Sequence, residues 1–198
     1  MNLVQQRGKP FEYFEQDENL SLLSVSQIRN AMFESYAGVP KETLASASQR
    51  GTALHRYFFF VLASRSGHCQ KPQPLVGLEG FCSAIDQWAN DMDVKPVLLE
   101  HPSLCRKHGY AGTPDALVVA GPRKILTLVD LKSGSSVVTE SIQLLLYKNM
   151  EGYEKAKRLV RLHINESGEY REIETKPDPR AWAAALCAIG ILRWRAAL

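Results

Sequence analysis

Residues 110–132 have the sequence YAGTPDALVVAGPRKILTLVDLK, and this stretch decides the fold. Its side chains follow a two-residue period, which is the spacing of a β-strand, whereas the chain before it has helical spacing. A Gly-Pro-Arg-Lys turn at 121–124 predicts one strand over Tyr110–Ala120 and a second over Ile125–Lys132. The two strands would form a hairpin at the centre of a sheet.

Two acidic residues bracket this hairpin. Asp115 and Asp130 are 15 positions apart, enough for one strand to run out, turn and come back beside itself. Alternation along the second strand places Asp130 and Lys132 on one face together with Leu126 and Leu128. A carboxylate and an ammonium therefore share a face at the end of a buried strand.

Charges in that place need a partner. A buried ion is costly unless it is paired or bound to a metal, and two converging carboxylates repel each other unless a cation or a proton lies between them. Mg²⁺ suits such a place, because it takes one or two carboxylates together with waters and phosphate oxygens. A lysine beside the metal can orient a hydroxide nucleophile or neutralise charge on a phosphate. The hairpin therefore favours a divalent-metal site that acts on phosphate.

Outward from the hairpin, the chain shows helical and strand-like segments in turn. The spacing predicts helices over Ser24–Glu34, from Ser46 or Gly51 to Ala63, and over Leu78–Asn90, Glu140–Lys157 and Arg180–Ala197. It predicts further strands over Val97–Glu100, Leu159–Ile164 and Tyr170–Glu174. Ser24 and Gln27 match a capping box, and Asp178 is placed to cap the last helix.

The remaining segments complete one α/β domain over 1–198. Residues 1–20 are expected to be an irregular lead-in, and His101–Gly109 a polar connection. The motif-bearing core would span 24–147, and 158–198 would add a hairpin and a helix. This order predicts a small mixed β-sheet flanked by helices on both faces.

Composition narrows the class of protein. The chain has 198 residues and a net charge of +3, which permits a nucleic-acid partner without requiring one. The four cysteines are scattered, without a CxxC pair, which argues against a zinc ribbon and favours a reducing cytosol. No signal peptide and no membrane-spanning run is expected.

Asp115 with Asp130-Leu131-Lys132 resembles the PD-(D/E)XK nuclease signature, and the GTPD wording at 112–115 is similar to its RecB-like branch, which includes phage-type exonucleases. Three further motifs resemble that branch in the same chain order: Arg50-Gly-Thr-Ala-Leu-His55, Glu100, and Gln143 with Tyr147. Gln143 and Tyr147 are four apart, so both project from one helix face. The short D-x-K pair is a weak signal by itself, and the ordered set is a stronger one.

This resemblance implies a restriction-endonuclease-like core and a nuclease that hydrolyses DNA phosphodiester bonds with Mg²⁺ or Mn²⁺. Its metal ligands would be Asp115, Asp130 and the Leu131 carbonyl, with His55 completing or bordering the site and Glu100 as a further candidate. Lys132 would assist the attacking water, and Gln143 and Tyr147 would position Lys132 or a phosphate.

The resemblance also implies partners and a location. We expect an exonuclease that acts on DNA ends, in the cytoplasm of a bacterial or phage-infected cell, with a recombination or helicase protein as a partner. Many RecB-like members carry four cysteines for an iron–sulfur cluster, but the cysteine spacing here does not match, so no cluster is predicted. The absence of a G-x-x-x-x-G-K-[ST] loop argues against a helicase activity.

Each motif also has a simpler explanation. Asp130 and Lys132 could form a surface ion pair, Asp115 a turn, and His55 a satisfied core histidine. Two other functions stay open: a catalytically inactive nuclease fold that binds nucleic acid or a partner protein, and a different metal-dependent hydrolase of small phosphorylated substrates. Exonuclease against endonuclease, polarity, strand preference, DNA against RNA, and oligomeric state are left undecided by the sequence.

Overall fold

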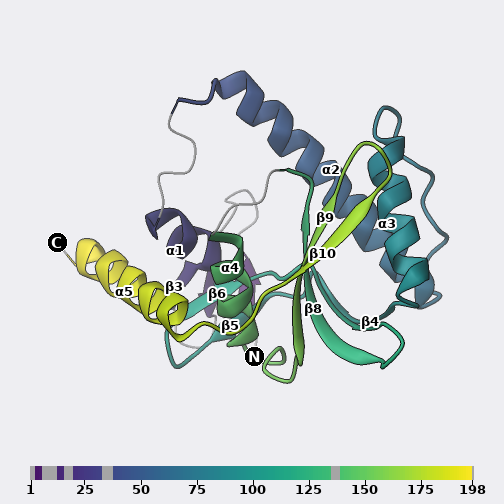
Figure 1. Cartoon of the computed structure of the whole chain (residues 1–198). Coiled ribbons are helices and arrows are strands. Elements are labelled where there is room, and N and C mark those ends of the chain that lie inside the picture. Colours follow the sequence, from purple (N-terminus) through teal and green to yellow (C-terminus); the bar gives the residue numbers. More distant parts are fainter. Residues whose placement is uncertain (1–2, 6–12, 16–19, 33–37, 135–138, 198) are drawn as a thin grey trace.

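A computed structural model describes the chain except residues 1–2, 6–12, 16–19, 33–37, 135–138 and 198 (Figure 1). Its larger sheet has the strand order β10-β9-β8-β7-β4. The bounds of these strands are Lys95–Leu99 (β4), Ala116–Ala120 (β7), Ile125–Lys132 (β8), Arg158–Ile164 (β9) and Tyr170–Glu174 (β10). β8 and β9 pair in parallel and the other neighbours are antiparallel, so the sheet is mixed, as predicted.

The β7–β8 hairpin lies at the centre of this sheet. β8 covers the predicted range, and the turn at 121–124 joins it to β7 with Ala116 opposite Val129. Alternation along β8 is also confirmed, because Leu128 packs on one face of the sheet while Val129 and Leu131 pack on the other.

The single strand expected over Tyr110–Ala120 is wrong. It is two strands, β6 (Tyr110–Gly112) and β7, separated by residues 113–115. Pro114 lies in that gap, where proline lacks the N–H that a strand ladder needs. The chain therefore bends here, and β6 belongs to a different sheet.

The smaller sheet has the order β1-β2-β3-β6-β5. Its other strands are Leu3–Gln5 (β1), Tyr13–Glu15 (β2), Leu20–Ser24 (β3) and Ser103–Cys105 (β5). The predictions of an irregular lead-in over 1–20 and of a polar connection over His101–Gly109 are therefore wrong for the residues that the structure describes. Three-residue strands are too short to show a period, and the pairing that joins β3 to β6 brings Leu23 beside Tyr110, far away in the sequence.

Helices cover both faces of the larger sheet, as predicted (Figure 1). α2 (Lys41–Arg65) and α3 (Glu79–Asp91) lie on one face around the buried Trp88. α1 (Val25–Met32), α4 (Thr139–Lys148) and α5 (Pro179–Ala196) lie on the other around Tyr110 and Tyr153. Among the described residues, no helix is both long enough and apolar enough to cross a membrane.

Both predicted helix caps are present. The Ser24 N–H donates to Gln27 Oε1 at 2.7 Å, and the Gln27 N–H donates to Ser24 Oγ at 3.1 Å, which is the reciprocal pair of a capping box. Asp178 Oδ1 accepts the Arg180 N–H at 2.9 Å at the start of α5. These contacts fix where α1 and α5 begin.

Helix bounds differ from the prediction in two places. α2 starts at Lys41, directly after Pro40, five residues before the earlier of the two expected starts. α4 ends at Lys148 rather than Lys157, because the chain turns repeatedly and Gly152 adopts a φ of 84°. The last two residues of the first predicted helix, 33–34, lie outside the described residues.

Gly80 of α3 allows a close approach between this helix and the β9–β10 turn. A Cβ at Gly80 would collide with the backbone carbonyl of Glu166, which cannot swing away as a side chain would. We expect Gly80→Ala to lower the free energy of unfolding by about 1–3 kcal/mol. A thermal melt would show this as a fall of about 2–4 °C for each kcal/mol in a domain of this size.

Gly190 provides the matched control. It lies exposed in α5, and a Cβ there would meet nothing within 4 Å. Gly190→Ala should therefore raise the free energy of unfolding by about 0.5–1 kcal/mol, because alanine favours a helix interior more than glycine does. Equal melting temperatures for the two variants would contradict the close approach at Gly80.

Candidate active site

The two acids that bracket the hairpin lie next to each other. Asp115 immediately precedes β7, and Asp130 lies in β8 beyond the Ala116–Val129 pair. Asp115 Oδ2 accepts the backbone N–H of Leu131 at 2.7 Å. The bend at Pro114 thus turns the Asp115 carboxylate onto the end of β8.

Lys132 joins this pair from the same face as Asp130. Its Nζ lies 2.7 Å from Asp130 Oδ2 and donates to Gln143 Oε1 at 3.2 Å. Asp130 is 1% exposed, and its Oδ2 is paired with the Lys132 ammonium. A buried carboxylate oxygen in this state can still accept a cation.

His55, one expected ligand, contacts Asp115 rather than standing apart. Its Nδ1 lies 3.0 Å from Asp115 Oδ1. The charge of Asp115 is the main reason that the pKa of His55 rises to about 9, and it outweighs burial, which lowers it. His55 is therefore an ion-pair partner of Asp115 in this arrangement and borders the candidate metal position.

Glu100 lies one residue beyond the end of β4, at a φ of 39°. Its backbone N–H donates to the backbone carbonyl of Asp115 at 3.0 Å, so it reaches the same end of the sheet. Burial and the nearby Asp115 charge raise the pKa of the Glu100 carboxyl. The structure therefore places Glu100 at the same end of the sheet as Asp115.

Gln143 and Tyr147 lie on the face of α4 that meets the acids. The Gln143 Nε2 donates to the Tyr147 hydroxyl at 3.1 Å, while Gln143 Oε1 accepts from both Lys132 and Arg29. Burial, followed by the charges of Asp130 and Asp115, raises the pKa of Tyr147 well above its ordinary value. Tyr147 is therefore a neutral hydroxyl beside the acid pair.

Opposite influences act on the two acids. Burial alone would raise the pKa of the Asp115 carboxyl, but His55, Lys132 and the Leu131 N–H together lower it. Burial raises the pKa of Asp130, and the Asp115 charge adds to the rise against the opposing Lys132. The anionic form of Asp115 is thus stabilised. The anionic form of Asp130 is destabilised by burial and by the charge of Asp115.

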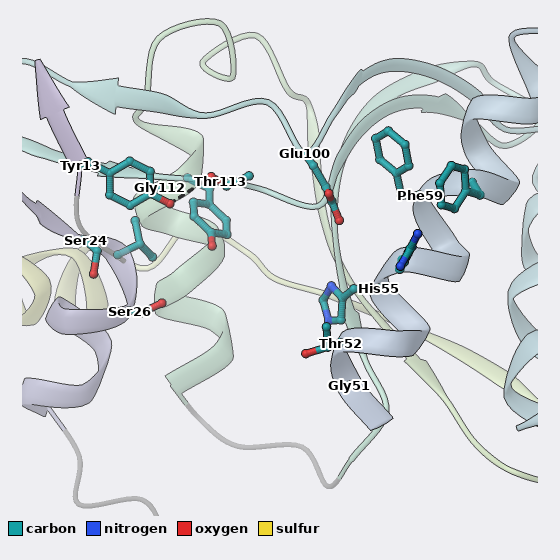
Figure 2. A pocket seen from close by; sticks show the side chains of 14 residues that line it. Tyr13, Ser24, Ser26, Gly51, Thr52, His55, Phe59, Glu100, Gly112 and Thr113 are labelled. Carbon is teal, nitrogen blue, oxygen red and sulfur yellow. Dashed lines mark hydrogen bonds between the residues drawn. The ribbon is translucent and has the colours of Figure 1, made fainter. Parts of the chain in front are cut away.

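A cleft of 770 Å³ opens beside this group (Figure 2). Among the residues that line it are His55, Glu100, Thr113 and Tyr147. Gly112 forms part of its wall, and a Cβ there would come within 2.8 Å of the Tyr147 ring. The glycine of the GTPD wording therefore leaves room for the Tyr147 ring.

Two residues of the site were missed by the sequence analysis. Arg29 of α1 reaches Gln143 across 114 positions. Tyr13 of β2 lines the cleft, and its hydroxyl lies 3.0 Å from Thr113 Oγ1 (Figure 2). Neither contact has a local sequence signal, although the aromatic content of the lead-in could have suggested a packed segment.

The donor set fits a cation that water and phosphate complete. Among the described residues, no three His, Cys, Asp or Glu side chains form a ready metal cage. One buried carboxylate, Asp130, and one partly buried carboxylate, Asp115, match the smaller protein share that Mg²⁺ usually takes. The Leu131 carbonyl as a third ligand stays a prediction.

Comparisons with known proteins support the fold alone. No protein-family model matches the chain, and no curated protein matches it in sequence. Among solved structures, it is similar to an alkaline exonuclease (LHK-Exo) from Laribacter hongkongensis, with a TM-score of 0.50 and 11% identity over 88% of this chain and 87% of that one. A structure of SSO0001 has a TM-score of 0.43 and 15% identity over 86% and 75% of the two chains. The first likeness is consistent with the PD-(D/E)XK-like core expected from the sequence.

Proposed function

We propose that this chain is a metal-dependent nuclease that hydrolyses DNA phosphodiester bonds. The observation that carries the proposal is the meeting of Asp115, Asp130 and Lys132 at the ends of two adjacent strands, beside an open cleft. The shared fold with a protein described as an alkaline exonuclease supports the same conclusion.

Asp115 and Asp130 would hold Mg²⁺ or Mn²⁺, with the Leu131 carbonyl as a third ligand. When bound, such a cation lowers the pKa of a bound water and offsets negative charge on the scissile phosphate. The ion pair between Asp115 and His55 fixes the orientation of that carboxylate. The hydrogen bond from the Leu131 N–H fixes the other oxygen of Asp115, so both carboxylate oxygens are oriented before substrate enters.

Lys132 supplies the positive charge that the chain itself directs at the phosphate. Its ammonium is held between Asp130 and Gln143, and from there it can donate to the attacking water or to a phosphate oxygen. Tyr147 and Arg29 in turn hold Gln143. This chain of contacts keeps Lys132 in one place while the phosphate gains charge in the transition state.

We further propose an exonuclease that attacks DNA ends. The test uses linear duplex DNA, single-stranded DNA and closed circular DNA, each with Mg²⁺, Mn²⁺ or EDTA. The expected result is degradation of linear DNA with metal, intact circles, and no reaction in EDTA. Calorimetry should show Mg²⁺ or Mn²⁺ binding at millimolar concentration.

Three outcomes would count against parts of this proposal. Cleavage of closed circular DNA would indicate an endonuclease rather than an exonuclease. DNA binding without cleavage or metal binding would favour an inactive nuclease fold. Hydrolysis of small phosphate esters without cleavage of DNA would favour a different hydrolase. A recombination or helicase partner and a cytoplasmic location stay predictions.

Gln143→Leu should reduce cleavage by about 10- to 100-fold, because a lysine displaced by a fraction of an ångström stabilises the phosphate less well. Gln143 is buried and holds Lys132, so leucine keeps the packing but removes the acceptor. The measurement is kcat on linear DNA, at a temperature where a melt shows the variant folded. Asn149→Leu, an exposed residue just past α4, is the control and should cleave normally. Unchanged kcat for Gln143→Leu would contradict its positioning role.

A further inference from the structure

α2 carries four aromatic residues in succession, Tyr57 to Phe60, and only two of them are buried in the hydrophobic core. Tyr57 and Phe58 are 2% and 1% exposed and pack toward α3. Phe59 and Phe60 remain partly exposed, on the part of the helix that faces the cleft. Because Phe59 follows His55 by four positions, the two side chains lie on one helix face.

Arg56, Phe59 and Phe60 together form what we call the aromatic ridge. The rings of Phe59 and Phe60 meet edge to face, with centroids 5.4 Å apart at 84°. The guanidinium carbon of Arg56 lies 5.8 Å from the centroid of Phe60, a cation–π distance. The ridge therefore combines flat apolar faces with a permanent positive charge.

The ridge is continuous with the candidate active site. All three of its residues line the 770 Å³ cleft together with His55 and Glu100. Figure 2 shows Thr52, His55 and Phe59 following one another along α2. On the other side, Phe59 and Phe60 line a second hollow of 410 Å³, together with the exposed Val97. A strand that enters the cleft would therefore lie along the ridge.

Charge decides what kind of ligand such a ridge suits. The acids beside the cleft repel a polyanion, and Arg56 is the one permanently charged cation among the described residues that line the cleft. Phosphate contacts alone therefore provide little attraction here. Aromatic faces can supply the rest, because nucleobases of every type stack on them.

Resting on the proposed nuclease function, we propose that Phe59 and Phe60 stack the bases of an unpaired DNA strand next to the candidate active site, with Arg56 beside its backbone. Bases inside a duplex have both faces covered by their neighbours, so only unpaired bases can stack on the ridge. The preferred substrate is therefore a single strand or a frayed end, and the ridge determines that specificity.

The test separates base stacking from phosphate contact. Binding of two fluorescein-labelled oligonucleotides of 12 nucleotides, one of thymidines and one of abasic sites, is measured by anisotropy in EDTA, so no cleavage occurs. Stacking predicts that the wild type prefers the thymidine strand by about 5- to 150-fold for each stacked base. Phe59→Leu and Phe60→Leu keep apolar bulk without a ring, and each should lose most of this preference while binding the abasic strand as before.

Trp194→Leu is the matched control. Trp194 is an aromatic residue that is 64% exposed, but it belongs to α5 rather than to the cleft. This variant should keep the full preference for the thymidine strand. If Trp194→Leu lost the preference for the thymidine strand and the two phenylalanine variants kept it, the proposal that bases stack on the ridge would be wrong.

The outcomes distinguish the two proposals. If the phenylalanine variants cleave DNA and prefer thymidine as strongly as the wild type does, the ridge is overturned and the nuclease stands. If the wild type shows a ring-dependent preference but cleaves nothing with Mg²⁺ or Mn²⁺, the nuclease is overturned and the stacking surface stands. If the wild type binds neither oligonucleotide, the ridge is overturned, and cleavage of DNA with Mg²⁺ or Mn²⁺ alone decides the nuclease.

Discussion

Asp130→Asn is expected to lower DNA cleavage by about 1,000-fold or more, since it removes one of the two carboxylates proposed to hold the metal. Asparagine has nearly the same shape, so the fold should persist. Cleavage of linear DNA with Mg²⁺ gives the activity, and calorimetry gives the metal affinity. We expect the binding heat to disappear together with the activity.

In EDTA, the stability of this variant relative to the wild type should increase as the pH rises above about 3.9. Burial and the Asp115 charge raise the pKa of Asp130, so its ionisation costs folding free energy at every pH above the ordinary value of about 3.9. Asparagine carries no charge and avoids this cost. The melting temperature relative to the wild type should fall as the pH drops through the raised folded-state pKa, and it should level off below about 3.9, where the wild-type carboxyl becomes protonated in both states.

Asp178→Asn makes the same chemical change at an exposed acid. Asparagine caps a helix about as well as aspartate, so this control should change neither activity nor stability appreciably. An Asp130→Asn protein that cleaves DNA at the wild-type rate would refute the assigned site. One whose melting temperature relative to the wild type in EDTA does not rise with pH would refute the electrostatic cost at Asp130.

Lys132→Met should reduce kcat by about 100- to 1,000-fold, which is the usual cost of removing one preorganised charge from a transition state. Methionine keeps much of the apolar stem and removes the ammonium that Asp130 and Gln143 hold. Metal affinity should not fall, because the variant retains both acids and loses a competing cation. Activity and metal binding therefore separate in this variant, whereas they disappear together in Asp130→Asn.

Lys124→Met is its matched control. Lys124 lies in the turn between β7 and β8 and pairs with Asp93, far along the hairpin from the acids. Its removal should leave kcat unchanged. If Lys132→Met retained activity within a few-fold of the wild type, Lys132 would be a structural partner of Asp130 and not a catalytic residue.

The sequence predicted the central hairpin well because two independent signals agreed there. A complete alternation and a Gly-Pro turn define β8 and its partner. Pro114 could have predicted the bend before β7, since proline within a strand pattern weakens it, but the apolar run from Tyr110 outweighed it. The three-residue strands β1, β2 and β5 had too few residues for any periodic signal.

The residues of the candidate site were predicted from different kinds of sequence signal. Local spacing suggested Asp115, Asp130 and Lys132, whereas His55, Gln143 and Tyr147 came from the family resemblance; the structure brings all six together. The contacts of Arg29 and Tyr13 span 114 and 100 positions. No local pattern encodes such distances, because the packing of α1 against α4 and the place of β2 in the smaller sheet create them.

The bend at residues 113–115 makes Asp115 a hinge point between two sheets. β6 pairs with β3 and β5 in the smaller sheet, while β7 lies inside the larger sheet. An event that loosens the smaller sheet would therefore move this acid although every side chain of the site is intact. Faster amide hydrogen exchange in β3 and β6 would accordingly signal that Asp115 is about to be displaced, before any change in the melting of the larger sheet.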